Sequence, residues 1–238
     1  MKIEELRNKM CIPADASKDD IAKTFEEIAE ALKNECVIKY DNEEYRILDF
    51  EFYFYNKNHQ DISVHPRNSE ALCWYINEFG GIDLNFESRV NKPKEEKWSF
   101  KYELTEDSYY GGILIRQIKR LSDNVVFDGP WKVAELFRVL DATSLNQKNP
   151  ILEIKPKGYL DSITFEKKKR HNLLGSYQYK EDKYKAKANY NIGEWFVIVS
   201  ESAKRDLEDN FETFVKSEYR YVYCKKPQDG QSTSKRLS

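Results

Sequence analysis

Residues 45–55, with the sequence YRILDFEFYFY, decide the fold that we expect for this chain. The stretch is rich in aromatic residues and bounded by polar ones, which predicts a β-strand. Side chains alternate between the two faces of a strand. The alternation therefore assigns Leu48, Phe50, Phe52 and Phe54 to a core face. The residues assigned to the opposite face are Ile47, Asp49, Glu51, Tyr53 and Tyr55.

This second face combines two carboxylates with two tyrosines, and two interpretations are open. Acidic and aromatic side chains together suit a site that holds a flat ligand and performs proton chemistry on it. The alternative is a half-exposed strand whose acids are simply solvated.

The composition describes a globular protein with a highly charged surface: 40% of the 238 residues are hydrophobic and 34% are charged. The 9 glycines argue against a glycine-rich nucleotide loop. None of the four cysteines forms a CxxC pair and the three histidines lack zinc spacing, so we expect reduced thiols, no metal and no cofactor. The absence of a long apolar run predicts a cytoplasmic protein without a membrane partner.

The pattern of periodicity and turn residues predicts an α+β fold in a single mixed domain over residues 1–226. The domain is expected to be built on a large antiparallel, barrel-like sheet with flanking helices, followed by a disordered polar tail over 227–238. Helices are predicted at 18–34, 70–79, 130–140 and 203–215. The first is predicted from the N-cap Ser17 and from the apolar stripe of Ile21, Phe25, Ile28 and Leu32 at helical spacing. Strands are predicted at 37–40, 45–55, 82–87, 98–104, 111–121, 151–154, 162–167, 195–200 and 218–224.

Arg116 is a second candidate site residue, because it shares a predicted strand face with the apolar Leu114 and Ile118. A guanidinium on an apolar face requires a partner, since an unpaired buried charge is costly. Asp49 or Glu51 on a neighbouring strand could supply it. The alternative is an edge strand from which Arg116 extends to water.

The segment 167–187 is a third candidate, with eight basic residues against Glu181 and Asp182 and with tyrosines interleaved. Basic groups attract phosphates and aromatic rings stack on bases, so the segment predicts a nucleic-acid-binding surface. A solvated lysine-rich loop is the alternative. The basic residues are Lys167, Lys168, Lys169, Arg170, Lys180, Lys183, Lys185 and Lys187.

Several short motifs, taken in order, resemble the alkyladenine (methylpurine, or 3-methyladenine) DNA glycosylase family, of which the chain looks like a divergent member. The resemblance covers roughly residues 18–155. It rests on the predicted helix 18–34 and on Glu51-Phe52-Tyr53, Asp61-Ile62-Ser63-Val64-His65, Pro66-Arg67-Asn68, Leu114-Ile115-Arg116 and Gly129-Pro130-Trp131-Lys132.

The resemblance implies that Glu51 is the general base, which deprotonates a water that attacks the sugar C1′ of a flipped-out nucleotide. It implies that Arg116 helps to hold this water and that Tyr53 stacks on the extruded base. A histidine of the loop would hydrogen-bond the base edge. His65 fits the Asp-x-x-x-His motif, whereas His59 lies at a more family-like distance before the proline, and both stay open.

The predicted function is therefore removal of a modified purine from DNA, rather than RNA, in base excision repair by a monomeric hydrolase. Asp49, two residues before Glu51, is the rival for the role of base. Residues 81–88 contain no tyrosine where the family inserts one into the duplex. A hydrolase of free nucleosides or nucleotides and a non-catalytic nucleic-acid-binding protein are the alternatives. Predicted nucleic-acid contacts are Arg67, Asn68, Lys132, Lys167, Lys168, Lys169, Arg170, Lys183, Lys185 and Lys187.

Overall fold

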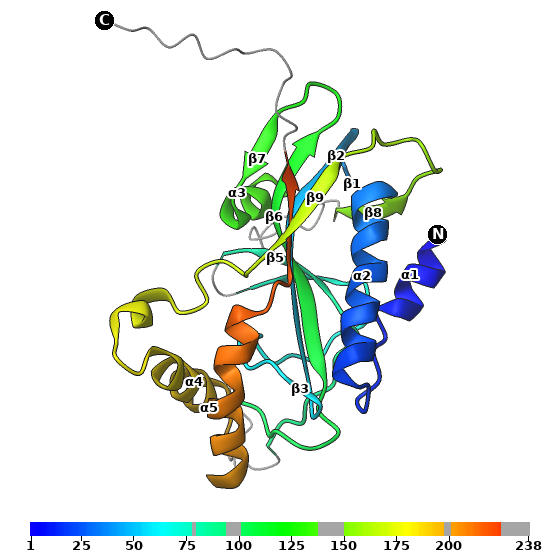
Figure 1. Cartoon of the computed structure of the whole chain (residues 1–238). Coiled ribbons are helices and arrows are strands. Elements are labelled where there is room, and N and C mark those ends of the chain that lie inside the picture. Colours follow the sequence, from blue (N-terminus) through cyan, green and yellow to red (C-terminus); the bar gives the residue numbers. More distant parts are fainter. Residues whose placement is uncertain (78–79, 94–100, 138–149, 198–200, 225–238) are drawn as a thin grey trace, which may run out of the picture.

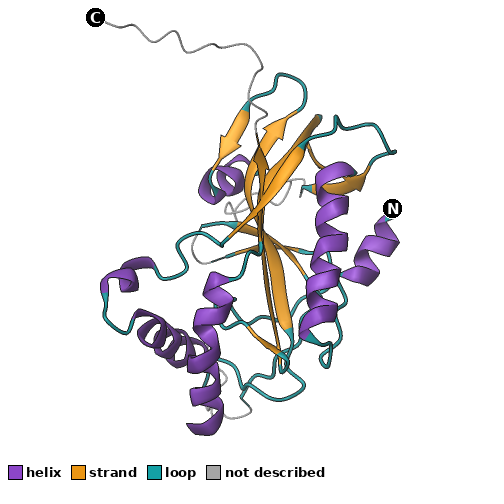
Figure 2. Cartoon of the chain, viewed as in Figure 1, coloured by secondary structure: helices purple, strands orange, loops and turns teal. Residues whose placement is uncertain are grey.

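The computed structural model of the chain describes residues 1–77, 80–93, 101–137, 150–197 and 201–224. It confirms the α+β fold, because one curled antiparallel sheet carries helices around it (Figures 1 and 2). The helices are α1 (Ile3–Lys9), α2 (Lys18–Asn34), α3 (Pro130–Leu136), the 3-10 helix η1 (Gly175–Tyr179), α4 (Lys183–Trp195) and α5 (Glu201–Lys216). The strands are β1 (Cys36–Tyr40), β2 (Glu43–Asn56), β3 (His59–Gln60), β4 (Trp74–Ile76), β5 (Ile82–Asn85), β6 (Tyr110–Arg120), β7 (Val126–Asp128), β8 (Ile151–Ile154), β9 (Thr164–Lys168) and β10 (Arg220–Cys224).

Strand β2 is the centre of the sheet, whose main path runs β4-β5-β6-β2-β1-β8. Along one edge β2 pairs with β6 from Tyr45 to Tyr55. Along the other edge it pairs first with β1 and then with β10, which in turn pairs with β9. The middle of β2 is thus hydrogen-bonded to a neighbouring strand on both edges and is not an edge strand.

Helix α2 forms as the sequence predicts and covers one face of β2. The Ser17 hydroxyl caps its first turn by accepting a hydrogen bond from the Asp20 N–H, which satisfies a donor that the helix itself leaves free. The predicted stripe of apolar residues is buried, and Phe25 of this stripe stacks on Phe52 with ring centroids 4.4 Å apart. Phe50, Phe52 and Phe54 all belong to this core.

Two bulges change the predicted alternation of β2 and β6. The register passes from Ile47 opposite Ile118 to Asp49 opposite Gln117, which leaves Leu48 as an extra residue on β2. A bulge inserts one residue and so exchanges the two faces of a strand. Ile47 therefore packs in the core with the phenylalanines, and Leu48, predicted to lie there, is not part of that cluster.

The second bulge falls on β6, where the register passes from Gln117 opposite Asp49 to Ile115 opposite Phe50 and leaves Arg116 as the extra residue. Ile118 and Ile115 both pack in the core in spite of their odd spacing. The prediction that Arg116 shares a face with Ile118 is thus wrong, whereas Leu114 does line the same cavity as Arg116.

A second hydrophobic cluster lies where α4 and α5 pack on the far end of β2 and β6. Tyr55 and Tyr110 stack with ring centroids 4.9 Å apart. Trp195 of α4 and Phe211 of α5 close this cluster. The loop that leads from β9 to η1 contacts the charged middle of β2, where the His171 N–H donates to Glu51.

Several predicted elements differ from the structure. Residues 70–79 were expected to form a helix, but the strand β4 forms there because it pairs with β5 in register. Residues 195–200 were expected to form a strand, yet Trp195 ends α4. Lys183, Lys185 and Lys187 of the basic segment 167–187 lie in the first turns of this helix and not in a loop. Of the predicted strand 98–104, the described part makes only isolated bridges. Of the predicted elements, residues 78–79, 98–100, 138–140 and 198–200 and the tail 227–238 lie outside the described residues.

None of the helices formed by the described residues is long and apolar enough to cross a membrane.

Candidate functional site

One row of side chains crosses five strands at the level of Glu51. The register places Lys168 of β9 opposite Arg220 of β10, and Arg220 opposite Glu51 of β2. Glu51 lies opposite Leu114 of β6, which lies opposite Asp83 of β5. Directly opposed residues share a face of the sheet. The row therefore aligns a lysine, an arginine, two acids and a leucine on one face, with Glu51 at its centre.

The Glu51 carboxylate is fully buried, and both of its oxygens have partners. The Tyr53 hydroxyl donates to Oε2 at 2.6 Å, and the backbone N–H of His171 donates to Oε1 at 2.8 Å. Burial, with the Glu51 carboxylate beside it, raises the pKa of the Tyr53 phenol well above its usual value. Tyr53 therefore remains a proton donor toward this carboxylate at neutral pH.

Two guanidinium groups complete the surroundings of the acids on β2. Arg220 binds Asp49 in a bidentate manner, with Nε to Oδ1 at 2.9 Å and Nη2 to Oδ2 at 2.5 Å, and its Nε lies 3.6 Å from Glu51. Arg116 Nε lies 3.5 Å from Glu51 Oε1 and 3.8 Å from Asp49 Oδ2. The bulge at Arg116 turns its side chain toward both acids, as expected of bulges beside functional sites.

These contacts exclude the interpretation of β2 as a half-exposed strand with solvated acids, because Asp49 is only 4% exposed and Glu51 is not exposed at all. The Asp49 carboxylate is committed to the Arg220 guanidinium. The predicted pairing of Arg116 with an acid on the adjacent strand is present, at an ion-pair distance rather than that of a direct charge-assisted hydrogen bond.

A cavity of about 400 Å³ lies beside these acids and guanidinium groups. Tyr53, Leu114 and Arg116 contribute from the sheet, and the loop after β9 and the helix α4 contribute the opposite wall. The carboxylate of Glu51 lies directly behind Tyr53 and His171, two of the lining residues. The full lining is Tyr53, Ser63, Val64, His65, Arg67, Asn77, Gly81, Asp83, Leu114, Arg116, Pro130, His171, Asn172, Leu173, Gly175, Lys187, Asn191 and Trp195.

Asp83 forms a second polar group of the cavity, one leucine away from Glu51. Its Oδ2 pairs with Arg67 Nη2 at 3.0 Å and its Oδ1 accepts from Asn77 Nδ2 at 3.1 Å. Burial raises the pKa of the Asp83 carboxyl, although Arg67 and Asn77 act in the opposite direction. Gly112 makes room for this pair, because a Cβ at that position would lie 2.3 Å from Arg67 Nη2.

The two candidate histidines occupy different environments. His65 lines the cavity, and its ring lies 5.5 Å from that of Trp195. His59 is fully buried, hydrogen-bonded through Nδ1 to the Phe54 carbonyl and through Nε2 to the Tyr219 hydroxyl. Burial lowers the pKa of His59 to about 4. His59 is thus part of the core, and the role of a base-contacting residue stays with His65 as a prediction.

Arg170 is not available to a phosphate, contrary to its predicted role. Its guanidinium is completely buried and pairs with Asp61, with Nη1 to Oδ2 at 2.5 Å. It also donates to the carbonyls of Phe52 and Phe214 and lies 4.7 Å from the Tyr53 ring centroid. Burial alone would lower the pKa of this guanidinium, but Asp61 raises it. The pair anchors the wall that carries His171.

The other predicted nucleic-acid contacts are dispersed. Lys167 pairs with Glu26 of α2, on the face opposite Glu51, and does not line the cavity. Lys187 does line the cavity, whereas Lys185 lies 3.7 Å from Glu208 of α5. Arg67, expected to contact nucleic acid, is buried against Asp83 but faces the cavity. The remaining predicted contacts are on the surface, exposed or half-buried: Asn68, Lys132, Lys168, Lys169 and Lys183.

Sequence reasoning missed Arg220, Asp83, Trp195 and the His171 backbone donor. Arg220 carried a signal, since it is the one charged residue among the alternating tyrosines of the last strand. The other three join the cavity only through the register of β5, the course of the loop after β9 and the packing of α4. Among the residues that the structure describes, no group of three or more His, Cys, Asp or Glu side chains is placed to hold a metal ion.

Comparisons with known proteins add one relative. The chain is 30% identical over 118 residues to an uncharacterized protein of Acanthamoeba polyphaga mimivirus. The match covers 44% of this chain and 52% of that protein, so it spans about half the length of the relative. No family model matches the chain, and no solved structure matches it.

Proposed function

We propose that this chain is a hydrolase of the N-glycosidic bond that accepts a nucleotide in the 400 Å³ cavity. The observation that carries the proposal is the buried Glu51 carboxylate behind the cavity wall, in contact with Tyr53 and beside Arg116. Glycosidic cleavage passes through a cationic, oxocarbenium-like transition state. A fixed carboxylate close to the sugar stabilises that charge and can accept a proton from water.

The walls of the cavity support a planar ligand. Tyr53, His65 and Trp195 provide flat surfaces from three different elements. Asp83 and Arg67 provide an acceptor and a donor at the edge. An extruded base needs such a combination of stacking surfaces and edge contacts. The nature of the base and the choice of DNA over RNA belong to the proposal, and a modified purine in DNA is its first candidate.

A second candidate function, binding without turnover, is favoured by the complete enclosure of Glu51. Glu51 has no exposed surface, and its oxygens accept hydrogen bonds from the Tyr53 hydroxyl and the His171 N–H, so one of these two groups must be displaced before a water can reach the carboxylate. A protein that only recognises the nucleotide has no need for that displacement.

Base release decides between these functions. The protein is incubated with oligonucleotides carrying hypoxanthine, ethenoadenine or methylated purines, and with the corresponding free nucleosides, and released base and abasic sites are measured. We expect Glu51→Gln to lower the rate by about 10²–10⁴ and to leave binding nearly intact, since the amide keeps the size of the side chain but cannot accept the proton. Tyr53→Ala is expected to weaken binding by roughly 1–3 kcal/mol through lost stacking.

Asp49→Asn is the matched control, because Asp49 lies on the same strand but is committed to Arg220. If Asp49→Asn abolishes release while Glu51→Gln does not, the base is Asp49 and the assignment to Glu51 is wrong. If the wild-type protein binds these ligands but releases no base from any of them, the non-catalytic function replaces the hydrolase.

A further inference from the structure

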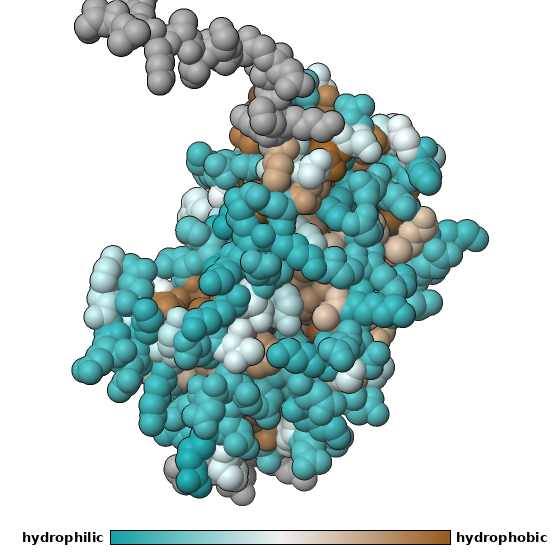
Figure 3. All heavy atoms as spheres, viewed as in Figure 1, coloured by the Kyte–Doolittle hydropathy of each residue, from teal (hydrophilic) through white to brown (hydrophobic). Residues whose placement is uncertain are grey.

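Three tyrosines on η1 and α4 present their rings at the surface, next to the cavity. Tyr179 is 85% exposed and Tyr190 is 43% exposed. The rings of Tyr177 and Tyr190 lie together, with centroids 5.7 Å apart and planes inclined by 42°. The rest of this side of the molecule is mostly hydrophilic, with apolar side chains confined to small areas (Figure 3). Grouped, exposed aromatic rings on such a surface indicate a binding function.

Lysines accompany these rings closely. The Lys180 ammonium lies 4.5 Å from the Tyr177 ring centroid, and the Lys187 ammonium lies 4.6 Å from that of Tyr190 and 5.6 Å from that of Tyr177. Lys183, Lys187 and Tyr190 recur at helical spacing along α4. The Lys183 ammonium itself lies 5.5 Å from the ring centroid of Tyr184. We call this group the tyrosine–lysine face: Tyr177, Tyr179, Lys180, Lys183, Lys187 and Tyr190.

The tyrosine–lysine face is continuous with the cavity. Leu173 and Gly175, which lead into η1, line the cavity, and so does Lys187. Lys187 therefore belongs to both the face and the cavity wall.

The charge of the segment is compatible with a polyanion. Residues 175–190 contain the acids Glu181 and Asp182 against four lysines, an excess of two positive charges. The excess is modest, so the rings must supply a large part of any binding energy. Bases in a single strand expose their faces to such rings, whereas a duplex presents phosphates and hides the base faces in its stack.

From this geometry we infer that the tyrosine–lysine face is a track for single-stranded nucleic acid that delivers a nucleotide to the cavity. The inference rests on the proposed function for the identity of the ligand in the cavity, and it names the substrate class as a single strand. Successive bases stack on Tyr177, Tyr179 and Tyr190, and the lysines contact the phosphates between them. A single-stranded substrate also needs no side chain to force a base out of a duplex.

The inference is tested by fluorescence anisotropy with a labelled oligo-dT strand and with the same strand annealed to oligo-dA. We expect the wild-type protein to bind the single strand more tightly than the duplex. Tyr177→Ala/Tyr190→Ala should weaken single-strand binding about tenfold or more and change duplex binding little. Lys180→Gln/Lys183→Gln should reduce the dependence of the logarithm of affinity on the logarithm of salt concentration by about 0.7 for each lysine.

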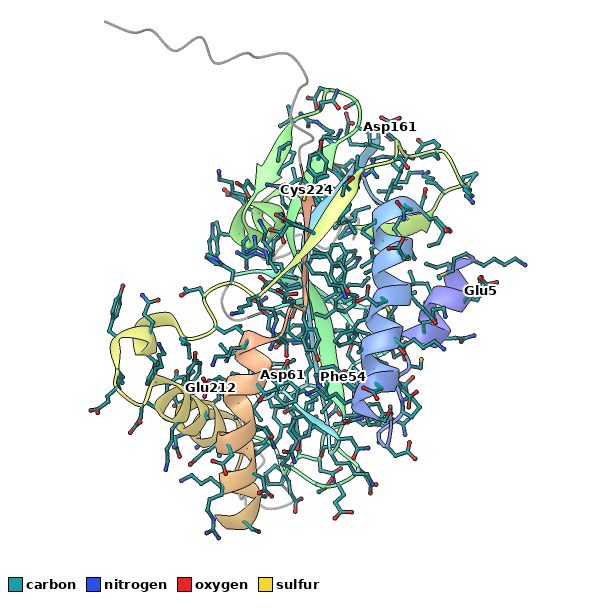
Figure 4. The ribbon with its side chains drawn as sticks, viewed as in Figure 1. Glu5, Phe54, Asp61, Asp161, Glu212 and Cys224 are labelled. Carbon is teal, nitrogen blue, oxygen red and sulfur yellow. The ribbon has the colours of Figure 1, made fainter. Side chains whose placement is uncertain are left out.

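The matched control is Lys157→Gln/Tyr159→Ala, which removes a lysine and a half-exposed tyrosine from the loop after β8. This loop, which also carries Asp161, lies at the opposite end of the molecule from α4 and α5 (Figures 1 and 4). We expect it to bind the single strand as the wild-type protein does. Equal affinity for strand and duplex, or tyrosine and lysine variants that bind as the control does, would overturn the inference.

The outcomes separate this inference from the proposed function. If single strands bind preferentially and this binding depends on the tyrosines, but no base is released, the track is supported and the proposed hydrolase activity is contradicted. Base release that is equally fast from duplexes and single strands, and equally fast in the tyrosine variant, supports the hydrolase and removes the track.

Discussion

Both faces of β2 are buried, one with apolar side chains and the other with charged side chains. On one face Phe50, Phe52 and Phe54 belong to a single apolar core. Within it Phe52 stacks on Phe25 of α2 and contacts the ring of Phe50. On the other face the buried acids are stabilised by guanidinium groups and by hydrogen bonds. The first arrangement gains stability from each buried ring. The second must compensate for desolvated charges before it contributes anything.

This contrast indicates which face is adapted to function. A protein selected only for stability would fill both faces with apolar side chains, since replacing a buried ion pair by well-packed apolar residues is often neutral or stabilising. The charged face of β2 instead keeps its acids beside an open cavity. The following variants test whether the two faces differ in energy as the contacts imply.

The largest effect is expected from Arg170→Met on the charged face. The variant leaves the Asp61 carboxylate buried without its partner and also loses the donors to the Phe52 and Phe214 carbonyls. Breaking such a buried pair costs about 3–5 kcal/mol, measured as the free energy of unfolding in urea. Lys168→Met, two residues away and half-exposed, is the control and should change stability by at most about 0.5 kcal/mol. A similar decrease in the free energy of unfolding in both variants would mean that the Arg170–Asp61 pair does not stabilise the fold more than a surface residue does.

An intermediate effect on the free energy of unfolding is expected when the pH is lowered, because His59 is buried beside Phe25 of the apolar core. Burial lowers the pKa of His59 to about 4, from an ordinary value of 6.5 for histidine. The unfolded chain therefore binds the proton more readily, and the stability that this histidine contributes is present above pH 6.5 and lost as the pH falls toward 4. Between pH 7 and pH 5 the loss is about 2 kcal/mol.

The measurement is urea unfolding at several pH values for the wild-type protein and for His59→Gln. The difference in stability between the two proteins should shrink as the pH falls, because glutamine does not titrate. A difference that stays constant from pH 7 to pH 5 would contradict a neutral, buried His59.

The smallest effect is expected from Phe52→Leu on the packed face, which keeps an apolar side chain but loses the stack on Phe25. A ring pair contributes about 0.5–1.5 kcal/mol beyond its buried area. A double-mutant cycle with Phe25→Leu isolates this term in the free energy of unfolding. Strict additivity of the two substitutions would show that the stack contributes nothing beyond burial.

Local sequence signals were sufficient for the elements that are governed by local chemistry. The N-cap Ser17 and the stripe of Phe25 and its neighbours predicted α2, and the aromatic run of residues 45–55 predicted β2. Prediction failed for residues 70–79, because the pairing of β4 with β5 overrides local helix preference. It also failed for α4, although Tyr184, Ala188, Ile192 and Trp195 recur at helical spacing, because the lysines at the start of this segment indicated a basic surface rather than a packed helix.

The sequence by itself determined that Glu51 and Tyr53 share a strand face and that Arg116 needs an acidic partner, because side-chain alternation and the cost of an unpaired charge are local facts. Only the tertiary structure decided which atoms meet. Two bulges, invisible in a pattern of alternating residues, turn Ile47 into the core and Arg116 toward the acids. Strand register then brings Arg220 and Asp83, distant in sequence, into the row of Glu51. Register and bulges depend on how whole strands pack, and no single stretch of sequence carries that information.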